Sequence, residues 1–349
     1  MPGSHPCAKA CRCLASLLLL PAAFALPGVA SAASPSTGPA PQDTPPPKVA
    51  PIFEQPGVLT PVGKWVVDPT FQYAYSSSNQ VSIIGYTIIP AIAIGSINVY
   101  TVHSNTSTFT LATRYGLTNR AEIELDIPYV YRNQSVLSRP IANGSGGTLN
   151  TYYATGSHLG DVSVTGRYQF NQGSADWPYF IGTLKLKSRT GIGPYEVPID
   201  PTTKLQTSLP TGSGFYGIEP GITALYASDP AVFFGSFNYL YSFKRHIGVQ
   251  NGIDYGDVTP GAAVEWNFGM GMAINERASF SLGYDGVWIG RTTQVGQPSS
   301  GTLSTQLGTL LLGYSYATSR TSYLNIAVGA GLTRDTPDVT LTVQLPMTF

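Results

Sequence analysis

Charged residues recur at alternate positions in several segments, where an extended backbone would put them on one face. Glu122, Glu124 and Asp126 form an acidic set, and Lys185 and Lys187 form a basic one. Successive side chains of a strand point to opposite faces, so the members of each set would point the same way. Together they could form a network of ion pairs or line a polar channel with a transverse field. Both interpretations stay open from the sequence.

Signals for catalysis are weak. Three histidines follow residue 32, namely His103, His158 and His246, and each falls in or near a predicted loop. His158 lies beside Ser157 and close to Asp161, the residue types of a Ser–His–acid site that would act on lipids. Such a trio arises easily by chance in a loop, so we expect no enzymatic activity, no cofactor and no metal. The glycines at 144–147 and 212–214 indicate flexible loops rather than phosphate cradles.

One alternating segment at the C-terminus predicts the fold class. From Val339 to Phe349, apolar side chains alternate with polar ones, so a strand there has one apolar and one polar face. An amphipathic strand that ends in a C-terminal aromatic residue is typical of the last strand of an outer-membrane β-barrel. We therefore expect Phe349 to be the signal that the barrel-assembly machinery recognises.

The N-terminus has the parts of a secretory signal peptide. Lys9 and Arg12 supply positive charge, an apolar run covers residues 14–26, and Ala30 and Ala32 fit a cleavage site. We expect residues 1–32 to be removed. All three cysteines lie within them, which excludes disulfides and cysteine-based metal sites from the mature chain.

Composition agrees with export to a membrane. Charged residues make up 11% of the chain, against about 25% in a typical soluble domain. The chain is rich in aromatic residues, with 21 Tyr and 14 Phe, and its formal net charge is zero. The absence of a basic surplus argues against nucleic acid as a partner. No apolar run after the signal reaches the roughly 18 residues of a spanning helix.

Two regions follow the signal. Residues 33–61 are a proline-rich linker, expected in the periplasm or in the barrel mouth. Residues 62–349 are expected to form an all-β, antiparallel, up-and-down transmembrane barrel in the outer membrane of a Gram-negative cell, in contact with its lipid. The alternation predicts twelve strands, at 64–75, 108–115, 122–132, 161–170, 180–187, 216–226, 233–243, 264–272, 279–288, 305–316, 323–332 and 339–349.

The predicted connections alternate in length, as those of outer-membrane barrels do. Short turns are expected on the periplasmic side, at 117–120, 171–177, 228–230, 274–277 and 318–320. Longer polar loops are expected outside the cell, at 133–156, 188–212, 244–257 and 291–302. The apolar stretch from Val81 to Val102 fits neither class. It is either a further hairpin, which would give fourteen strands, or a loop folded over or into the pore, which we favour.

Within such a barrel the charged face of each strand must point inward. A lipid-facing Arg or Lys near the midplane costs about 2–4 kcal/mol, whereas the lumen is polar. The residues predicted to line the lumen are Arg114, Glu122, Glu124, Asp126, Arg132, Arg167, Lys185, Lys187, Glu219, Glu265 and Asp285. Aromatic residues near strand ends are expected to form the interfacial girdles, namely Tyr129, Tyr131, Tyr239, Tyr241, Trp266, Trp288, Tyr314 and Tyr316.

Several strings add a family resemblance. They include Thr113-Arg-Tyr-Gly-Leu-Thr-Asn-Arg120, Leu209-Pro-Thr-Gly-Ser-Gly-Phe215 and Ser228-Asp-Pro-Ala-Val-Phe-Phe-Gly235. Together these strings, in order over residues 57–349, resemble the outer-membrane barrel family named for the meta-pathway of phenol degradation. Within that family the chain looks most like the barrel that exports functional-amyloid subunits in the Fap system.

The resemblance implies a twelve-stranded barrel that passes either an unfolded polypeptide or small hydrophobic and aromatic solutes. It also implies a homotrimer held by a periplasmic coiled coil, although residues 33–61 contain no heptad repeat. We therefore predict an outer-membrane channel or transporter with a charged lumen. A barrel enzyme acting on lipids and a closed structural barrel are the alternatives.

Overall fold

The computed structural model describes most of the chain beyond the linker. The described residues are 59–77, 81–84, 87–90, 97–142, 145–146, 150–172, 177–200, 206–228, 230–250, 252–295, 297–298 and 304–349. The predicted signal peptide with Ala30 and Ala32, and residues 33–58 of the predicted linker, lie outside them. In the described part of the chain, no helix is long and apolar enough to cross a membrane.

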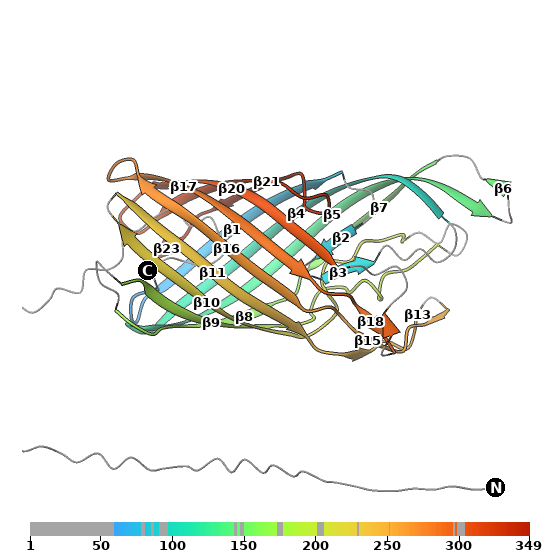
Figure 1. The fold of residues 1–349 in the computed structure, drawn as a ribbon, viewed down its shortest axis with the longest axis horizontal. Coiled ribbons are helices and arrows are strands. Elements are labelled where there is room, and N and C mark those ends of the chain that lie inside the picture. The colour runs from blue at the N-terminus through green and yellow to red at the C-terminus, as the bar shows by residue number, and fades with distance from the viewer. Residues whose placement is uncertain are drawn as a thin grey trace, which may run out of the picture. The chain divides into compact units, whose positions relative to one another are not determined.

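The described residues form a closed, antiparallel β-barrel of 12 strands, which confirms the predicted fold class (Figure 1). The first half of the wall is formed by β1 (Trp65–Ser76), β4 (Ile97–Thr118), β5 (Ala121–Ala142), β7 (Asn150–Leu159) with β8 (Ser163–Gln169), β9 (Tyr179–Lys187) and β10 (Gly217–Ser228). The second half is formed by β11 (Ala231–Ser242), β16 (Ala263–Ala273), β17 (Ala278–Ile289), β20 (Thr305–Ala317), β21 (Tyr323–Gly331) and β22 (Val339–Gln344) with β23 (Met347–Thr348).

The C-terminal segment closes the wall. β22 pairs with β21 on one side and with β1 on the other, and β23 extends the second pairing. Phe349 and Trp65 exchange two backbone hydrogen bonds, with N···O distances of 2.8 and 3.3 Å. Pro346, which has no amide hydrogen, falls at the break between β22 and β23, where no ladder bond is lost. The barrel therefore has no unpaired edge at its seam.

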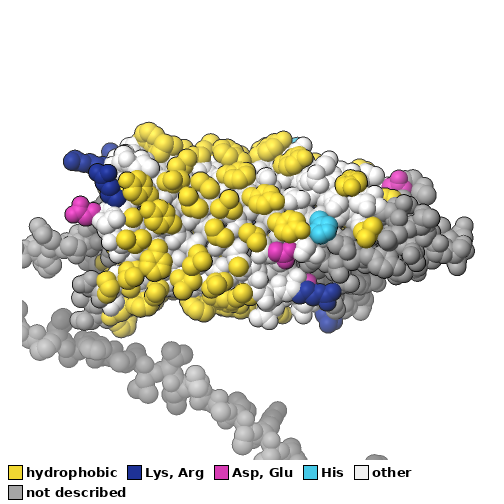
Figure 2. All heavy atoms as spheres, turned by 90° about the horizontal axis from the view of Figure 1, so that it is seen from above, with side chains coloured by type: hydrophobic (Ala, Val, Ile, Leu, Met, Phe, Trp, Pro, Cys, Tyr) yellow, Lys and Arg dark blue, Asp and Glu magenta, His cyan; other side chains and the backbone are white. Residues whose placement is uncertain are grey.

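Alternation along each strand sorts the side chains. On β5, Ile123, Leu125 and Ile127 are exposed, whereas the intervening Glu122 and Glu124 are buried. Figure 2 shows the outcome on one face of the barrel, where hydrophobic side chains cover the wall and charged side chains gather at its two ends. This apolar outer surface and the closed barrel are those of a protein of the Gram-negative outer membrane.

The short predicted turns join consecutive wall strands. β4 and β5 are separated by Asn119 and Arg120 alone, and residues 274–277 and 318–320 also connect neighbouring strands. Because outer-membrane barrels have short turns on the periplasmic side, we assign the end with these turns to the periplasm and the opposite end to the outside of the cell.

Three predicted extracellular loops are instead partly strand. Residues 133–142 continue β5, and residues 150–156 belong to β7, so the prediction of a loop at 133–156 was wrong for most of its length. These strands project past the rest of the wall (Figure 1). Apolar and polar residues do not alternate regularly along these segments, so the pattern that reveals a membrane strand is missing. The predicted loops at 244–257 and 291–302 likewise contain the short strands β12 (Arg245–His246), β13 (Val249–Gln250), β14 (Ile253–Asp254) and β18 (Thr293–Gln294), with β15 (Asp257–Thr259) at the end of the first.

The ambiguous stretch from Val81 to Val102 adds no strand to the wall. Among the described residues, β2 (Val81–Ile84) pairs with β3 (Thr87–Pro90), in a two-stranded sheet separate from the barrel. Residues 97–102 begin β4. The wall therefore keeps twelve strands, and the fourteen-strand alternative was wrong because the hairpin pairs with itself.

Deleting Phe349 should reduce assembly more than transport, because it removes both backbone bonds to Trp65 and the terminal aromatic ring. We expect the amount of heat-modifiable barrel in isolated membranes to fall severalfold. The barrels that do assemble should conduct as the unaltered protein does. Phe349→Tyr, which keeps the bonds and an aromatic ring, is the control, and equal assembly of the deletion and this control would contradict the prediction.

Candidate functional site

The inner face of the wall carries a compact network of ion pairs near the periplasmic end. Arg167 on β8 lies between Glu122 and Glu124 on β5, with Nη1 2.9 Å from Glu122 Oε1 and Nη2 2.9 Å from Glu124 Oε1. Arg114 on β4 adds Nη2–Asp68 Oδ2 at 3.3 Å and Nε–Glu124 Oε2 at 3.6 Å. Their side chains are almost wholly buried, and the opposite charges meet across neighbouring strands. Asp68 was not among the residues predicted to line the lumen, although this residue alternates with the apolar residues of β1.

The chain that precedes β1 completes this network. Leu59 is buried against Ile181 and Leu225, which lie on β9 and β10. The backbone amide of Thr60 donates to Glu122 Oε2 at 2.6 Å. Residues 59–60 therefore lie inside the periplasmic mouth, in contact with wall strands on two sides.

Gly116 on β4 lets this segment approach the wall. Its amide donates to the Lys64 carbonyl at 3.1 Å, and its carbonyl accepts from Gly63 at 2.8 Å. A Cβ at position 116 would lie 2.2 Å from the carbonyl oxygen of Pro61. A larger residue would therefore displace the segment from the wall.

At the extracellular end, the connection between β9 and β10 folds back against the inner wall. We call its described parts, residues 188–200 and 206–216, the inward loop. Val197, Leu209, Thr211 and Phe215 within it are buried. Arg132, on the inner face of β5, donates from Nη1 to the Pro210 carbonyl at 3.3 Å. The predicted extracellular loop at 188–212 therefore turns inward.

The inward loop also covers an edge of the wall. β7 continues past the end of β9, and there Ser208 forms a parallel bridge with Thr155. The amide of Leu209 donates to the Thr155 carbonyl at 3.0 Å. The same segment therefore faces the lumen and also pairs with backbone groups at the free edge of β7.

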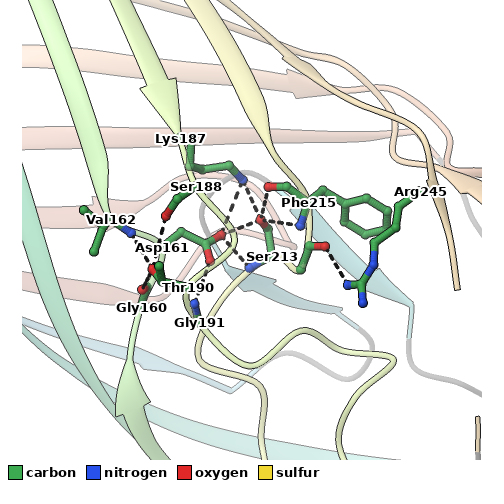
Figure 3. A network of polar contacts seen from close by, with 11 residues as sticks. Gly160, Asp161, Val162, Lys187, Ser188, Thr190, Gly191, Ser213, Phe215 and Arg245 are labelled. Atoms are coloured by element: carbon green, nitrogen blue, oxygen red, sulfur yellow. Dashed lines mark hydrogen bonds and ion pairs between the residues drawn. The ribbon is translucent and has the colours of Figure 1, made fainter.

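A polar cluster fastens the inward loop to the wall (Figure 3). Asp161 lies where the chain steps from β7 to β8, and its Oδ2 accepts from the Ser213 hydroxyl at 2.5 Å and from the Ser213 amide at 2.8 Å. Lys187, the last residue of β9, donates to Ser213 Oγ at 2.7 Å and lies 3.7 Å from Asp161 Oδ2. We call Asp161, Lys187 and Ser213 the latch.

Glycines let the two arms of the inward loop lie side by side. A Cβ on Gly191 would lie 2.6 Å from the Cα of Gly212, and one on Gly193 would lie 2.8 Å from the Cα of Gly214. Any side chain at these positions would push the arms apart. The glycines at 212–214 are buried and closely packed, so here they allow two backbone segments to approach each other. The repeated Gly-x-Gly pattern at 191–193 and 212–214 was the signal available in the sequence.

An aromatic cluster joins the inward loop to the next extracellular loop. Tyr195 and Phe215 are buried with Ile247, Tyr255 and Val258. The Tyr195 ring lies 4.9 Å from that of Tyr255 and 6.2 Å from that of Phe215, centroid to centroid. Burial raises the pKa of Tyr195 to about 12, so the phenol stays neutral at physiological pH. This packing holds the loop from its extracellular side.

An ion pair crosses the same junction. Arg245 Nη2 lies 2.7 Å from Glu196 Oε1, and Arg245 Nη1 donates to the Gly214 carbonyl at 2.9 Å. Burial opposes the charge of Glu196, but the Gly193 amide and Arg245 outweigh it and lower the pKa of this carboxyl below its usual 4.5.

The other residues predicted to line the lumen lie on the inward-facing side of their strands. Asp126 accepts from the Ser163 hydroxyl at 2.9 Å. Lys185 on β9 is directly opposite Glu219 on β10, which brings opposite charges to adjacent positions. Glu265 pairs in register with Asn238, and Asp285 with Asn267, two asparagines that are buried. Whether these groups contact a passing solute stays a prediction.

The structure separates the candidate catalytic trio. Ser157 and His158 are consecutive residues of β7, so their side chains point to opposite faces and cannot form a Ser–His pair. Asp161 is engaged with Ser213, and His158 lies 3.3 Å from the Leu159 carbonyl. Within the described ranges, no group of three His, Cys, Asp or Glu side chains is arranged to hold a metal ion.

Comparisons with known proteins agree with the fold. No family model matches the chain. The chain is similar to an outer membrane channel from Pseudomonas putida F1, with a TM-score of 0.55 and 14% identity over 85% of this chain and 100% of that one. Weaker similarities link it to the translocator domain of the autotransporter NalP from Neisseria meningitidis (TM-score 0.43, 9% identity, 83% and 89% covered) and to the CymD monoaromatic hydrocarbon channel (TM-score 0.38, 10% identity, 83% and 88% covered). The first similarity supports the outer-membrane barrel fold.

Replacing Arg167 with methionine should destabilise the barrel, because it leaves Glu122 and Glu124 buried without their shared cation. Breaking a buried pair costs about 3–5 kcal/mol. We expect the free energy of unfolding in detergent, measured by urea titration, to fall by about that amount. Arg320→Met, at an exposed turn, should change it by less than about 0.5 kcal/mol. An equal effect of the two substitutions would show that the network does not stabilise the fold.

Acid should loosen the inward loop through Glu196. Because the folded-state pKa of this carboxyl is lowered, its stabilising contribution is present above pH 4.5 and is lost as pH falls through the lower folded value. We expect protease cleavage within the loop to increase in acid. Glu196→Gln should already be cleaved faster at neutral pH, and its difference from the unaltered protein should shrink in acid. A constant difference at all pH values would refute this role.

Proposed function

We propose that this protein is a gated outer-membrane channel for small solutes, and that the inward loop is its gate. The observation that carries the proposal is the latch, which fastens a folded-in loop to inward-facing residues of the wall by polar contacts. Polar contacts can exchange with water at low net cost, so the latch itself can open readily, whereas the aromatic cluster around Tyr195 and Phe215 has to separate as well.

The barrel architecture fits passage through the lumen. Eight strands pack shut with side chains and sixteen or more leave a wide aqueous channel, so twelve strands leave an intermediate space. The inner face bears Arg114, Arg167 and Lys185 beside several carboxylates, a lining suited to water and polar groups. The Pseudomonas barrel of similar fold is an outer membrane channel, and we carry that activity to this chain as part of the proposal.

We propose small aromatic or hydrophobic compounds as the solutes. When the inward loop moves away from the next extracellular loop, aromatic surfaces separate, since Tyr195 of the inward loop packs against Tyr255. A flat aromatic solute could stack on these rings as they part. The resemblance to the barrel family of phenol degradation supports the same class.

Export of an unfolded polypeptide, the other cargo that the resemblance implies, makes a larger demand on this structure. A polypeptide in transit would occupy the lumen along its whole length, whereas a small solute occupies one level of it at a time. Both the inward loop and residues 59–60 would have to leave their buried positions for it. We therefore place small solutes first and make polypeptide passage an outcome of the test.

Substituting Gly212 with alanine should open the channel. A Cβ there would lie 2.4 Å from Asp161 Oδ1 and 2.7 Å from the Cα of Gly191, so the loop cannot keep its place. We expect the open probability in planar bilayers to rise at least several-fold. Gly166→Ala, on β8, is the matched control, because a Cβ there meets no atom within 4 Å.

The same two variants can test the cargo. In liposomes, Gly212→Ala should admit phenol-sized solutes faster than the control, as measured by swelling or by loss of an encapsulated reporter. Passage of an unfolded peptide at a comparable rate would favour a polypeptide channel. Equal and negligible conductance of both variants would refute the channel assignment.

A further inference from the structure

A pocket of about 490 Å³ lies on the extracellular side of the barrel, where the ends of β9, β10 and β11 meet β12. Six side chains that line it are Arg189, Tyr216, Phe243, Lys244, Arg245 and His246. The pocket combines exposed aromatic rings with a concentration of basic groups. Arg189 and Tyr216 belong to the inward loop, and Phe215, which also lines the pocket, is buried in the aromatic cluster.

The aromatic half of the pocket continues the lipid-facing surface. Ile218 and Tyr241 are paired in register on β10 and β11, and Tyr241 is exposed on the outer wall. Two residues further toward the outside, Tyr216 and Phe243 are also exposed, and their backbones are joined by a 2.9 Å bond from the Phe243 amide. These rings therefore lie at the extracellular edge of the apolar surface, where acyl chains meet headgroups.

The basic half carries a net positive charge. Arg189 lies over the Tyr216 ring, with its guanidinium carbon 5.5 Å from the ring centroid. Lys244 Nζ and His246 Nδ1 share the carboxylate of Asp257, at 2.9 and 2.8 Å, and Arg245 pairs with Glu196. Three permanent cations and one histidine thus face two carboxylates. The side chains of Lys244 and His246 are 61% and 72% exposed and can reach a ligand.

A ligand that matches both halves must have an anionic headgroup directly above acyl chains. Guanidinium and ammonium groups are the preferred partners of phosphate oxygens in proteins. A cationic cluster at the membrane surface attracts anionic lipid by about 1 kcal/mol per Lys or Arg. Free phosphate would use the cations but would leave the exposed rings without a role.

We propose that this pocket binds the phosphate groups of a phosphorylated glycolipid in the outer leaflet, of the lipid A type. The acyl chains would lie along Tyr216 and Phe243, and the phosphate would sit between Arg189 and Lys244. The lipid would bind to exposed side chains whether or not the inward loop acts as a gate, so the proposal does not rest on the channel activity.

The test uses the full-length protein in detergent, titrated with diphosphoryl lipid A and followed by native mass spectrometry. The double variant Arg189→Gln/Lys244→Gln should bind at least ten-fold more weakly. Asp257→Asn should bind several-fold more tightly, because it removes the carboxylate that competes with phosphate for Lys244 and His246. Arg277→Gln/Arg320→Gln removes two exposed cations at the periplasmic turns and should bind as the unaltered protein does.

Four further measurements make the outcome decisive. Heat-modifiable migration checks that each variant is folded, and Arg189→Lys/Lys244→Arg should retain binding because it keeps both charges. Equal binding of lipid A with and without its phosphates would overturn the proposal, as would equal binding by the unaltered protein and the Gln double variant. Displacement of the lipid by millimolar inorganic phosphate would overturn the assignment of a lipid ligand.

Discussion

Pairing of the backbone inside lipid is the constraint on which the rest of this structure depends. A membrane offers no water to unpaired amides and carbonyls, so a sheet that crosses it has to close. Here closure is made by β22 and β23 against β1, ending in the two bonds between Phe349 and Trp65. Once the sheet is closed, alternation fixes which side chains meet lipid and which meet each other across the lumen.

Charge on the inner face then has to be compensated within the barrel. Arg167 is shared by Glu122 and Glu124, and the second oxygen of Glu122 accepts the amide of Thr60. This network both stiffens the wall and holds the chain segment that enters the periplasmic mouth. These contacts are those expected of a network of ion pairs, whereas the interpretation of the same side chains as the lining of a channel stays a prediction.

The extracellular half is organised by a loop that folds back against the wall, in addition to the extended strands β5 and β7. Because β9 stops at Lys187 while β7 continues outward, the connection between β9 and β10 can fold inward and cover the edge of β7. On its periplasmic side, Asp161 and Lys187 hold the loop through Ser213. On its extracellular side, Ile247, Tyr255 and Val258 pack against its Tyr195 and Phe215. The latch is polar and contacts inward-facing residues, whereas the basic pocket at Arg189 and Lys244 opens beside the lipid-facing wall. The latch thus faces the lumen and the basic pocket faces the lipid, although the residues of the two sites are close in sequence.

The sequence by itself determined the fold class, the twelve wall strands and the face of each strand that carries charge, because these follow from a local period of two. It placed Glu122 and Glu124 on the same side without any knowledge of their partners. It could not show that residues 133–142 and 150–156 are strand, since apolar and polar residues do not alternate regularly there. Nor could it bring Asp161 to Ser213, which are 52 positions apart, or turn residues 188–216 inward. Those contacts exist only after the wall has closed, because strand lengths and register then decide which distant side chains share the lumen.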